Sequence, residues 1–526
     1  MSSLRSENGK YFLRGPLGRS LKVEKIGNFS VFREGLEPAT FLDMKIAFAS
    51  SEMVPYAKTG GLADVAGALP LELHARGEEV AAFLPWYRTV RAAGTAVRDT
   101  GVELDVDLGF LSASGRVLEA DPAPGPRVFF IDAPEFFDRD DLYQTRGRDH
   151  FDNAPRFAFF ARAVIEAVSK LELEPDVFHA NDWQTALIPV YLKTLHAAGP
   201  LGKAGTLLTI HNLAYQGVFP EAAFPVTGLP ETLFDWTRLE FFGKVNYLKG
   251  GIVYAGALNT VSSTYAREIL TPAFGAGLED VLKTREKDLF GVVNGIDTSV
   301  WNPGTDPHLP ARYAREDLAG KQACKRALCE EAGLDDADAP LFAMISRLAH
   351  QKGVDLLAES VDALVSMGAP LVVLGTGDPL YHRMLEKAEK KHPGKVKAFL
   401  AFDNALAHRI EAGADVFLMP SRYEPCGLNQ LISMRYGTIP VARRTGGLAD
   451  TVVDAGPDAM ASGEATGFVF EKATGKAFVE ACARAVEAFG MREAWSRLVR
   501  TGMAKDWSWK RAAGEYLDLY RRAGRR

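Results

Sequence analysis

Two positively charged side chains stand close together at the expected start of one helix. Arg347 and Lys352 lie in the segment Ser-Arg-Leu-Ala-His-Gln-Lys-Gly at 346–353, which follows an apolar, strand-like run. A helix N-terminus presents unpaired N–H groups and the positive end of the helix dipole, and a guanidinium can bind two phosphate oxygens at once. The spacing therefore predicts a diphosphate site. The alternative is an ordinary helix start with solvated surface charges.

A glycine motif occurs twice in the chain. The hexapeptide Thr-Gly-Gly-Leu-Ala-Asp is found at 59–64 and again at 445–450, and a cation precedes each copy, Lys58 or Arg444. A Gly-Gly pair lets the backbone turn tightly and approach a ligand closely, and the residues after it read as the first turn of a helix. Two copies with adjacent cations predict two related halves that hold one ligand between them. Two unrelated strand-to-helix turns are the alternative.

One carboxylate is held by unusual turn chemistry. Glu424 lies in the segment Pro-Ser-Arg-Tyr-Glu-Pro-Cys-Gly-Leu-Asn-Gln at 420–430, between a strand end and a helix start, and Pro425 and Gly427 fix the turn around it. We expect the carboxylate to point into a cleft, although most glutamates are simply exposed. Cys426 has no general base nearby in the sequence, so we interpret it as a packed structural thiol.

A histidine and an aspartate follow two strand-like runs of the first half. His211 stands in Thr-Ile-His-Asn-Leu-Ala-Tyr-Gln-Gly, and Asp182 stands in His-Ala-Asn-Asp-Trp-Gln. In an open α/β sheet, ligands bind beyond the carboxyl ends of the strands, which favours a site role for both residues. The alternatives are a histidine whose hydrogen bonds are satisfied within the structure and an aspartate that caps the following helix.

Strand-like runs alternate with helical patterns along most of the chain, which is typical of βαβ units and doubly wound parallel sheets. We therefore predict an α/β protein with two Rossmann-like domains that face a cleft. The strands expected in the two halves are 45–49, 80–84, 128–131, 177–179 and 206–210, then 341–345, 370–374, 397–401, 416–419 and 439–442.

Turn chemistry around Asn294-Gly295 indicates the junction between the domains. We place the N-terminal domain at 44–290 and the C-terminal domain at 291–505. Residues 506–526 form a helix with one apolar face, which could pack on either domain. Residues 1–43 lack the apolar core of a secretory signal. They are either an extension with loose order or a stretch upstream of a start at Met44.

The composition excludes several classes of protein. A chain of 526 residues exceeds one compact core, and a net charge of −6 argues against a general nucleic-acid binder. Four cysteines without CxxC spacing suggest neither a disulfide framework nor a zinc site and favour the cytoplasm. No apolar run approaches the roughly 20 residues that span a bilayer. We also expect no metal, and we make no prediction of the oligomeric state.

Taken together, these motifs resemble the bacterial glycogen synthase and plant starch synthase family, whose members are retaining glucosyltransferases of the GT-B type. The resemblance covers essentially everything from Met44 onward, and its two signatures are Lys-Thr-Gly-Gly-Leu-Ala-Asp-Val from residue 58 and Ser-Arg-Tyr-Glu-Pro-Cys-Gly-Leu-Asn-Gln from residue 421. It implies transfer of glucose from ADP-glucose, without a cofactor, to the non-reducing end of an α-1,4-glucan. The segment before Met44 has no counterpart in the pattern.

The resemblance also implies a role for each site residue. Glu424 would stabilise the positive charge at the anomeric carbon, His211 would contact the transferred glucose, and Asp182 would shape the same pocket. The remaining residues would bind the donor's diphosphate and sugar: Lys58, Gly60 and Gly61 from the N-terminal side, and Arg347, Lys352, Thr445, Gly446 and Gly447 from the C-terminal side.

Three other functions fit part of the pattern. A GT-B transferase that uses UDP-glucose would keep the fold and most of the cations. A nucleotide-sugar epimerase would need no glucan. A glucan-binding protein without catalysis would be expected to lack the phosphate-binding cations or Glu424, and this chain has both.

Overall fold

The structure is a computed structural model that describes residues 44–121, 125–145 and 147–524, together with the backbone of four short segments before residue 44. It divides into two compact units, 1–44 and 45–526. In the first unit, four strands pair antiparallel in sequence order. They are β1 (Leu4–Glu7), β2 (Lys10–Arg14), β3 (Ser20–Ile26) and β4 (Phe29–Arg33). The remaining residues of 1–43, and all side chains there, lie outside the described part.

The N-terminal half of the second unit is built on a nine-stranded sheet. Seven strands are parallel, and a long hairpin, β7 and β8, adds two antiparallel strands at one edge. In spatial order the strands are β18 (Leu289–Gly291), β17 (Ala257–Thr260), β13 (Gly205–Ile210), β12 (Val177–Asn181), β5 (Lys45–Ala49), β6 (Glu79–Pro85), β9 (Arg127–Asp132), β8 (Ser112–Ala120) and β7 (Val97–Asp107).

The C-terminal half contains a six-stranded sheet in which every neighbouring pair is parallel. Numbered within this half, its order is 3-2-1-4-5-6, the Rossmann order. The strands are β21 (Val396–Phe399), β20 (Leu371–Leu374), β19 (Phe342–Ile345), β22 (Val416–Met419), β23 (Ile439–Arg443) and β24 (Phe468–Phe470).

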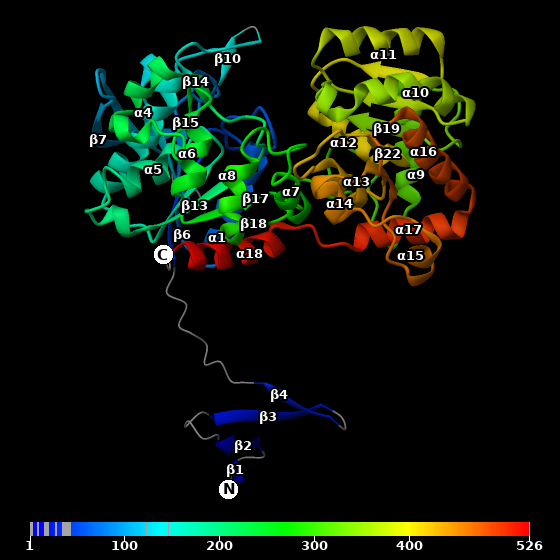
Figure 1. The fold of residues 1–526 in the computed structure, drawn as a ribbon. Coiled ribbons are helices and arrows are strands. Elements are labelled where there is room, and N and C mark those ends of the chain that lie inside the picture. The colour runs from blue at the N-terminus through cyan, green and yellow to red at the C-terminus, as the bar shows by residue number, and fades with distance from the viewer. Residues whose placement is uncertain are drawn as a thin grey trace. The chain divides into compact units, whose positions relative to one another are not determined.

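Helices cover both sheets (Figure 1). Those of the N-terminal half are α1 (Gly61–Ala75), α2 (Arg88–Ala92), α3 (Pro134–Phe137), α4 (Asn153–Lys170), α5 (Leu187–Lys193), α6 (Tyr247–Tyr254), α7 (Ser263–Glu268) and α8 (Glu279–Thr284). Those of the C-terminal half are α9 (Ala319–Ala332), α10 (Val354–Ser366), α11 (Pro379–Lys391), α12 (Asn404–Gly413), α13 (Asn429–Arg435), α14 (Gly446–Thr451), α15 (Pro457–Ser462), α16 (Gly475–Gly490) and α17 (Arg492–Ala504). The last helix of the chain is α18 (Trp509–Ala523).

Shorter elements complete the described chain. They are the 3-10 turns η1 (Leu201–Lys203), η2 (Glu221–Thr227), η3 (Glu231–Leu233), η4 (Glu286–Asp288) and η5 (His350–Lys352), the hairpin β10 (Gln144–Thr145) and β11 (Arg148–Asp149), and a small sheet of β14 (Val218–Pro220), β16 (Lys244–Asn246) and β15 (Glu240–Phe241).

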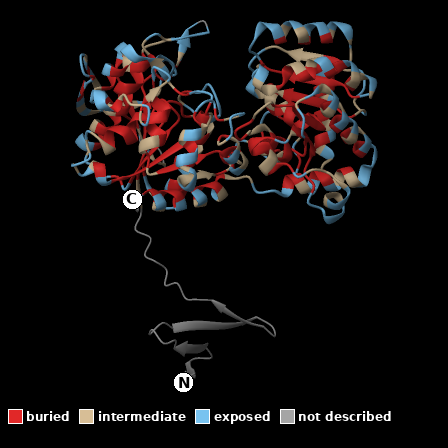
Figure 2. Cartoon of the chain, viewed as in Figure 1, coloured by how far each residue is buried: buried red, intermediate tan, exposed pale blue. Residues whose placement is uncertain are grey.

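The central strands of both sheets are deeply buried, because helices pack on them (Figure 2). β12 and β13 are buried along their whole length, as expected for central strands of a covered parallel sheet. In the C-terminal half, α10 packs with α11 and α16, while α9 packs with α12. Both sheets thus have the apolar interior that a rigid scaffold for a site requires.

The last helix returns to the N-terminal half. α18 packs against α1 and β13, and the Tyr520 hydroxyl lies 2.9 Å from Nδ1 of the buried His179. Asn259 donates a hydrogen bond to the Tyr516 hydroxyl at 3.1 Å. The aromatic face predicted for residues 506–526 therefore packs on the first domain, a choice that the sequence left open.

All ten expected strands are present, most of them with small shifts at their ends. β5 and β22 match their predicted ranges, whereas β21 begins and ends earlier than predicted. The antiparallel pair β7 and β8 was not predicted, and neither were β17, β18 and β24. The predicted domain limits at 44, 291 and 506 stay predictions.

Each sheet has a point where the strand order reverses, and the candidate motifs follow the strands on its two sides. In the N-terminal half this point lies between β5 and β12, and in the C-terminal half between β19 and β22. Ligands of doubly wound sheets bind at such points because the loops on either side diverge there. The motif at 346–353 follows β19 and the motif at 420–430 follows β22, so the topology brings both to the carboxyl ends of these neighbouring strands.

Candidate functional site

The predicted cation and carboxylate of the C-terminal half form an ion pair. Lys352 Nζ lies 2.6 Å from Glu424 Oε2, and Ser421 Oγ donates to the same oxygen at 3.0 Å. Glu424 is only 5% exposed, so solvent screens the pair weakly. A buried carboxylate needs such partners, and here both come from the strand ends at the switch point.

A glycine allows this ion pair to form. Gly353 has φ of +68°, and a Cβ there would lie 2.0 Å from the carbonyl oxygen of Pro420. The start of α10 therefore packs directly on the turn that carries Glu424. The Arg422 N–H also donates to the carbonyl of Gln351 at 2.8 Å.

The second copy of the glycine motif packs against the backbone of the turn that carries Glu424. A Cβ on Gly446 would lie 2.0 Å from the Glu424 carbonyl oxygen, and one on Gly447 would lie 2.0 Å from that of Cys426. The Gly447 N–H donates to the Glu424 carbonyl at 3.1 Å. Burial raises the pKa of the Cys426 thiol to about 12, which agrees with a packed structural thiol.

Carboxylates occupy the free N–H groups of both glycine motifs. Glu52 accepts from the N–H groups of Thr59 and Gly60 at 2.6 and 3.0 Å. Glu268 accepts from the Thr445 hydroxyl at 3.0 Å and from the Gly446 N–H at 3.1 Å. The sequence predicted phosphate or sugar at these helix starts, but a ligand would reach the donors only by displacing a glutamate.

The contact between α7 and α14 is reciprocal. Glu268, at the end of α7, caps the start of α14, and Asp450 from α14 caps the start of α7. Asp450 accepts from the Thr264 N–H at 3.0 Å, from its hydroxyl at 2.6 Å and from the Ser263 hydroxyl at 3.1 Å. Glu268 thus supplies the side-chain cap that α14 lacks, and Asp450 adds to the cap that Ser262 already provides for α7.

Lys58 lies at the surface beside its own motif. Its Nζ lies 2.7 Å from Asp64 Oδ1, and the two side chains are 45% and 34% exposed. Burial raises the pKa of Asp64, and Lys58 partly offsets this. A Cβ on Gly61 would lie 3.9 Å from Leu428 Cδ1, so the first glycine motif lies against the segment that follows Glu424.

Asp182 and His211 lie together at the ends of β12 and β13. Asp182 Oδ1 accepts from the backbone N–H of His211 at 2.7 Å, and His211 Nε2 lies 2.9 Å from Asn181 Oδ1. Burial raises the pKa of Asp182 to about 7 and lowers that of His211 to about 3. The imidazole is therefore neutral at physiological pH.

Asp182 occupies a strained backbone position. Its φ is +54°, in the left-handed region that non-glycine residues seldom adopt. Such conformations cluster at functional sites, because the surrounding structure must hold them in place. Here the Asp182 N–H donates to the Thr209 carbonyl at 2.9 Å, which fixes the end of β12 against β13.

A hydrogen bond connects the histidine loop with the C-terminal half. Arg347 Nη1 donates to the Tyr215 hydroxyl at 3.3 Å. Arg347 also donates to Gln351 at 3.2 Å and remains exposed. Among the described residues, no carboxylate forms an ion pair with its guanidinium, which Tyr215 and Gln351 hold in place.

The structure therefore brings most of the predicted residues together, but in three groups. Lys352 and Glu424 are in direct contact, Asp182 and His211 are in direct contact, and Arg347 links the two halves through Tyr215. Lys58 contacts none of these side chains among the described residues. Its motif approaches the others through Gly61 and Leu428.

Sequence reasoning missed several residues that hold the site in shape. Glu52 caps the first glycine motif and also accepts from the Tyr143 hydroxyl at 2.9 Å, and Glu268 caps the second motif. Glu52 had a usable signal, since it lies between the first predicted strand and its glycine motif. Nothing in the sequence distinguishes Glu268 from other helix glutamates.

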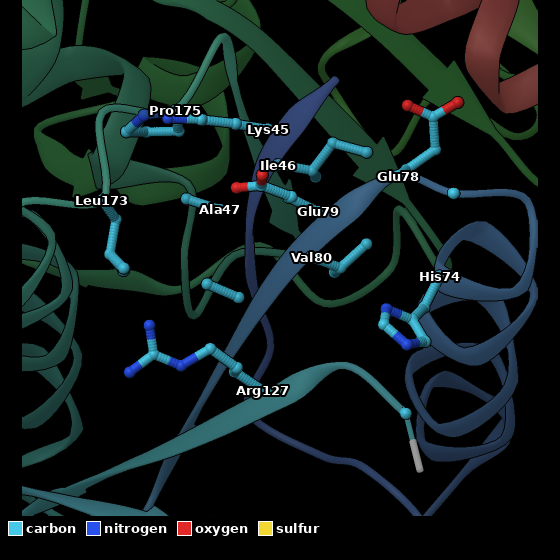
Figure 3. A pocket seen from close by; sticks show the side chains of 13 residues that line it. Lys45, Ile46, Ala47, His74, Glu78, Glu79, Val80, Arg127, Leu173 and Pro175 are labelled. Carbon is cyan, nitrogen blue, oxygen red and sulfur yellow. The ribbon is translucent and has the colours of Figure 1, made fainter. Parts of the chain in front are cut away.

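A cavity of about 290 Å³ lies elsewhere in the N-terminal half (Figure 3). It is lined by the first residues of β5 and β6, with His74, Arg127, Leu173 and Pro175 around them. These are the amino ends of the strands, whereas the site motifs follow the carboxyl ends. The cavity therefore does not belong to the candidate site.

Neither a metal cluster nor a membrane span occurs in the part of the chain that the structure describes. No group of three or more His, Cys, Asp or Glu side chains there is arranged to hold a metal ion. None of the described helices combines the length and the apolar composition needed to cross a bilayer.

Comparison with known proteins agrees with this geometry. A family model for the starch synthase catalytic domain matches residues 45–284, and one for glycosyl transferases group 1 matches residues 330–501. Glycogen synthases from Anaeromyxobacter dehalogenans (strain 2CP-C) and Koribacter versatilis (strain Ellin345) are 49% and 46% identical, over 91% of this chain and 99% and 98% of their own.

Solved structures point the same way. The catalytic domain of starch synthase IV from Arabidopsis thaliana, bound to ADP and acarbose, is 34% identical with a TM-score of 0.85, covering 92% of this chain and 100% of that one. Sucrose-phosphate synthase from Thermosynechococcus elongatus, at 19% identity and a TM-score of 0.57 over 91% and 98% of the two chains, shares the fold.

Two doubly wound domains, with cations and a buried carboxylate at a switch point, define a glycosyltransferase of the GT-B fold. The chain belongs to the bacterial glycogen synthase and plant starch synthase family.

Proposed function

We propose that this protein transfers glucose from ADP-glucose to the non-reducing 4-hydroxyl of an α-1,4-glucan, with retention of configuration and release of ADP. The observation that carries the proposal is the buried ion pair of Lys352 and Glu424 at the switch point of the C-terminal sheet. A diphosphate needs a cation, and a developing glycosyl cation needs a carboxylate. Here the two groups are 2.6 Å apart.

Donor binding would separate this ion pair. Lys352 would turn to the diphosphate, where Arg347 joins it, and Glu424 would then face the sugar. Arg347 is suited to this because its present partners are the neutral groups of Tyr215 and Gln351. The separated charges would stabilise the two ends of the breaking bond, negative on the phosphate and positive on the sugar.

The reaction needs no further charged species. The bond between the anomeric carbon and the diphosphate oxygen breaks, and its electron pair stays with ADP. The acceptor's 4-oxygen then bonds to the anomeric carbon on the same face, and its proton passes to the leaving phosphate oxygen. Retention follows because attack and departure share one face of the sugar.

Asp182 and His211 would shape the glucose pocket. The Asp182 carboxyl is already engaged by the His211 N–H, which argues for a positioning role and against attack on the sugar. His211 is neutral and its one ring N–H donates to Asn181 Oδ1, so the other ring nitrogen can accept a hydrogen bond from a glucose hydroxyl without adding positive charge beside a glycosyl cation.

Parallel assays with two donors test the proposal. Purified protein is incubated with glycogen and labelled ADP-glucose or UDP-glucose, and label in the polymer is counted. We expect faster incorporation from ADP-glucose. Faster incorporation from UDP-glucose would show that UDP-glucose, and not ADP-glucose, is the donor. Donor conversion without glycogen would favour the epimerase, and no conversion at all would favour a binding protein.

A further inference from the structure

Two exposed aromatic side chains stand in one short segment beside the histidine loop. Trp236 is 75% exposed and Phe242 is 81% exposed, and both precede α6 in the N-terminal half. Single exposed hydrophobic residues are common on proteins. These two differ because a strained turn and hydrogen bonds from a buried side chain fix the backbone that carries them.

Phe242 occupies a turn position that aromatic residues do not favour. Phe241 pairs with Lys244 across β15 and β16, so Phe242 and Gly243 form a two-residue hairpin loop. Their φ values are +50° and +72°, the signs of a type I′ turn, which strongly prefers asparagine followed by glycine. Phenylalanine in the left-handed region is strained by about 1 kcal/mol. Neighbouring groups must therefore hold the backbone of this turn in place.

Several hydrogen bonds do so. Glu240 accepts from the Gly243 N–H at 2.6 Å, which closes the loop. The buried Lys249 Nζ donates to the carbonyls of Trp236, at 2.5 Å, and of Glu240. A buried lysine thus joins the backbone beside both rings.

The same segment is continuous with the wall of the site. Asn246 donates to Gln216 at 2.7 Å, and Gln216 donates to the Ala276 carbonyl at 3.0 Å. A Cβ on the next residue, Gly277, would lie 3.0 Å from the ring of Phe241, which itself packs edge-on to that of Phe242 at 4.7 Å. Gln216 directly follows Tyr215, the partner of Arg347.

We propose that Phe242, together with Trp236, binds the glucan chain outside the reaction centre. The face of a glucose ring that carries its C–H groups is apolar and packs on an aromatic ring, while its hydroxyls stay in water. The occupant is the acceptor rather than the donor, because the cations that suit a diphosphate lie on the C-terminal half. This inference rests on the proposed function, since it extends the acceptor site of that reaction.

The test compares a long and a short acceptor in Phe242→Asn. Asparagine suits the turn better than phenylalanine, so the variant should fold at least as stably as the unchanged protein. We expect its KM for maltoheptaose to rise about fivefold or more, as loss of one aromatic contact of roughly 1 kcal/mol implies. Its KM for maltotriose and for ADP-glucose, and its kcat at saturation, should stay within about twofold.

Phe110→Ala is the matched control, because Phe110 is 74% exposed but stands between β7 and β8 at the edge of the sheet. It should leave all of these constants unchanged. If Phe242→Asn leaves the KM for maltoheptaose unchanged, or raises that for maltotriose equally, the inference is wrong. If the unchanged protein transfers no glucose to either acceptor, the proposed function fails instead.

Discussion

At the scale of single residues, the two cations of the C-terminal half differ in what their loss would do. Arg347 has neutral partners in Tyr215 and Gln351, so its removal leaves no buried charge without a counter-ion. Lys352 also neutralises the buried Glu424, so its removal leaves a carboxylate without its counter-ion.

Alanine substitutions test both roles. Charge-assisted hydrogen bonds contribute about 1.5 to 3 kcal/mol, so Arg347→Ala should lower kcat by about a hundredfold, and Lys352→Ala by at least as much. Steady-state assays with ADP-glucose and glycogen measure both. Lys476→Ala is the control, because that lysine is 88% exposed on α16, and it should behave as the unchanged protein. Near-normal kcat in both site variants would rule out the diphosphate assignment.

Asp182 and His211 make opposite contributions to the pH dependence of stability. Folding raises the pKa of Asp182 from 3.8 to about 7, so the folded state keeps a proton that the unfolded state releases, and this contribution falls as pH rises through that window. Folding lowers the pKa of His211 from 6.5 to about 3, so this contribution falls as pH drops below 6.5.

Asp182→Asn should remove only the first of these contributions. Asparagine can still accept the His211 N–H, so the fold is kept. From about pH 4 to 6.5, the variant's free energy of unfolding should rise more steeply with pH than that of the unchanged protein. Urea unfolding at a series of pH values measures this. Parallel curves for the two proteins would contradict the burial of an uncharged carboxyl at this position.

The chemistry of these residues was readable from the sequence, whereas their partners were not. Arg347, Lys352 and Glu424 stand in motifs whose turn residues reveal a strand end, so their common location followed from topology. The contact of Lys352 with Glu424 depends on tertiary packing, because Gly353 must lie against Pro420. Residues that are 72 positions apart give no local signal of such a contact.

At the scale of elements, the reciprocal caps of α7 and α14 join the two halves. Glu268 and Asp450 each satisfy N–H groups at the start of the other helix. Caps of this kind stabilise a helix start by about 1 kcal/mol. Burial raises the pKa of Glu268, and the Gly446 N–H is the strongest influence that opposes this.

Glu268→Ala and Asp450→Ala should each lower the free energy of unfolding by about 1 kcal/mol. Because both residues belong to one contact, the double variant should lose less than the sum, by about 0.5 kcal/mol or more. Chemical denaturation of the four proteins gives this comparison. Asp280→Ala serves as control, since its side chain is 87% exposed and should have little effect. Strict additivity would show that the two caps act independently.

Elements with strong local patterns were predicted well, and those defined by pairing partners were not. β5 and β22 are short, buried apolar runs, and they appear where expected. β7 and β8 have exposed residues on one face and lie antiparallel at the sheet edge, so the rule for alternating strands and helices gave no sign of them. The side on which α18 packs depends on tertiary contacts of Tyr516 and Tyr520.

At the scale of the whole molecule, the order of strands gives each sheet a switch point of its own. Two such points would let one chain bind both the donor and the acceptor of the proposed reaction. Each half has its own switch point, and motifs from both flank the contact of Gly61 with Leu428. The repeated hexapeptide indicated two related halves, and both halves are doubly wound. What the repeat did not reveal is that carboxylates cap both copies.

Side chains are expected to balance the diphosphate charge. Transfer assays with EDTA should therefore run at the same kcat as assays with added magnesium, because Arg347 and Lys352 supply the positive charge that a cation would otherwise bring. A loss of activity in EDTA that magnesium restores would show that the two side chains are insufficient.

The most direct test of the central claim is glucose transfer from labelled ADP-glucose to glycogen by the purified protein and by Glu424→Ala. Glu389→Ala is the matched control, since Glu389 pairs with Lys397 at 2.8 Å on the same half. We predict transfer by the unchanged protein and by the control, and loss of nearly all transfer in Glu424→Ala. Undiminished transfer by Glu424→Ala would contradict the assignment of the site.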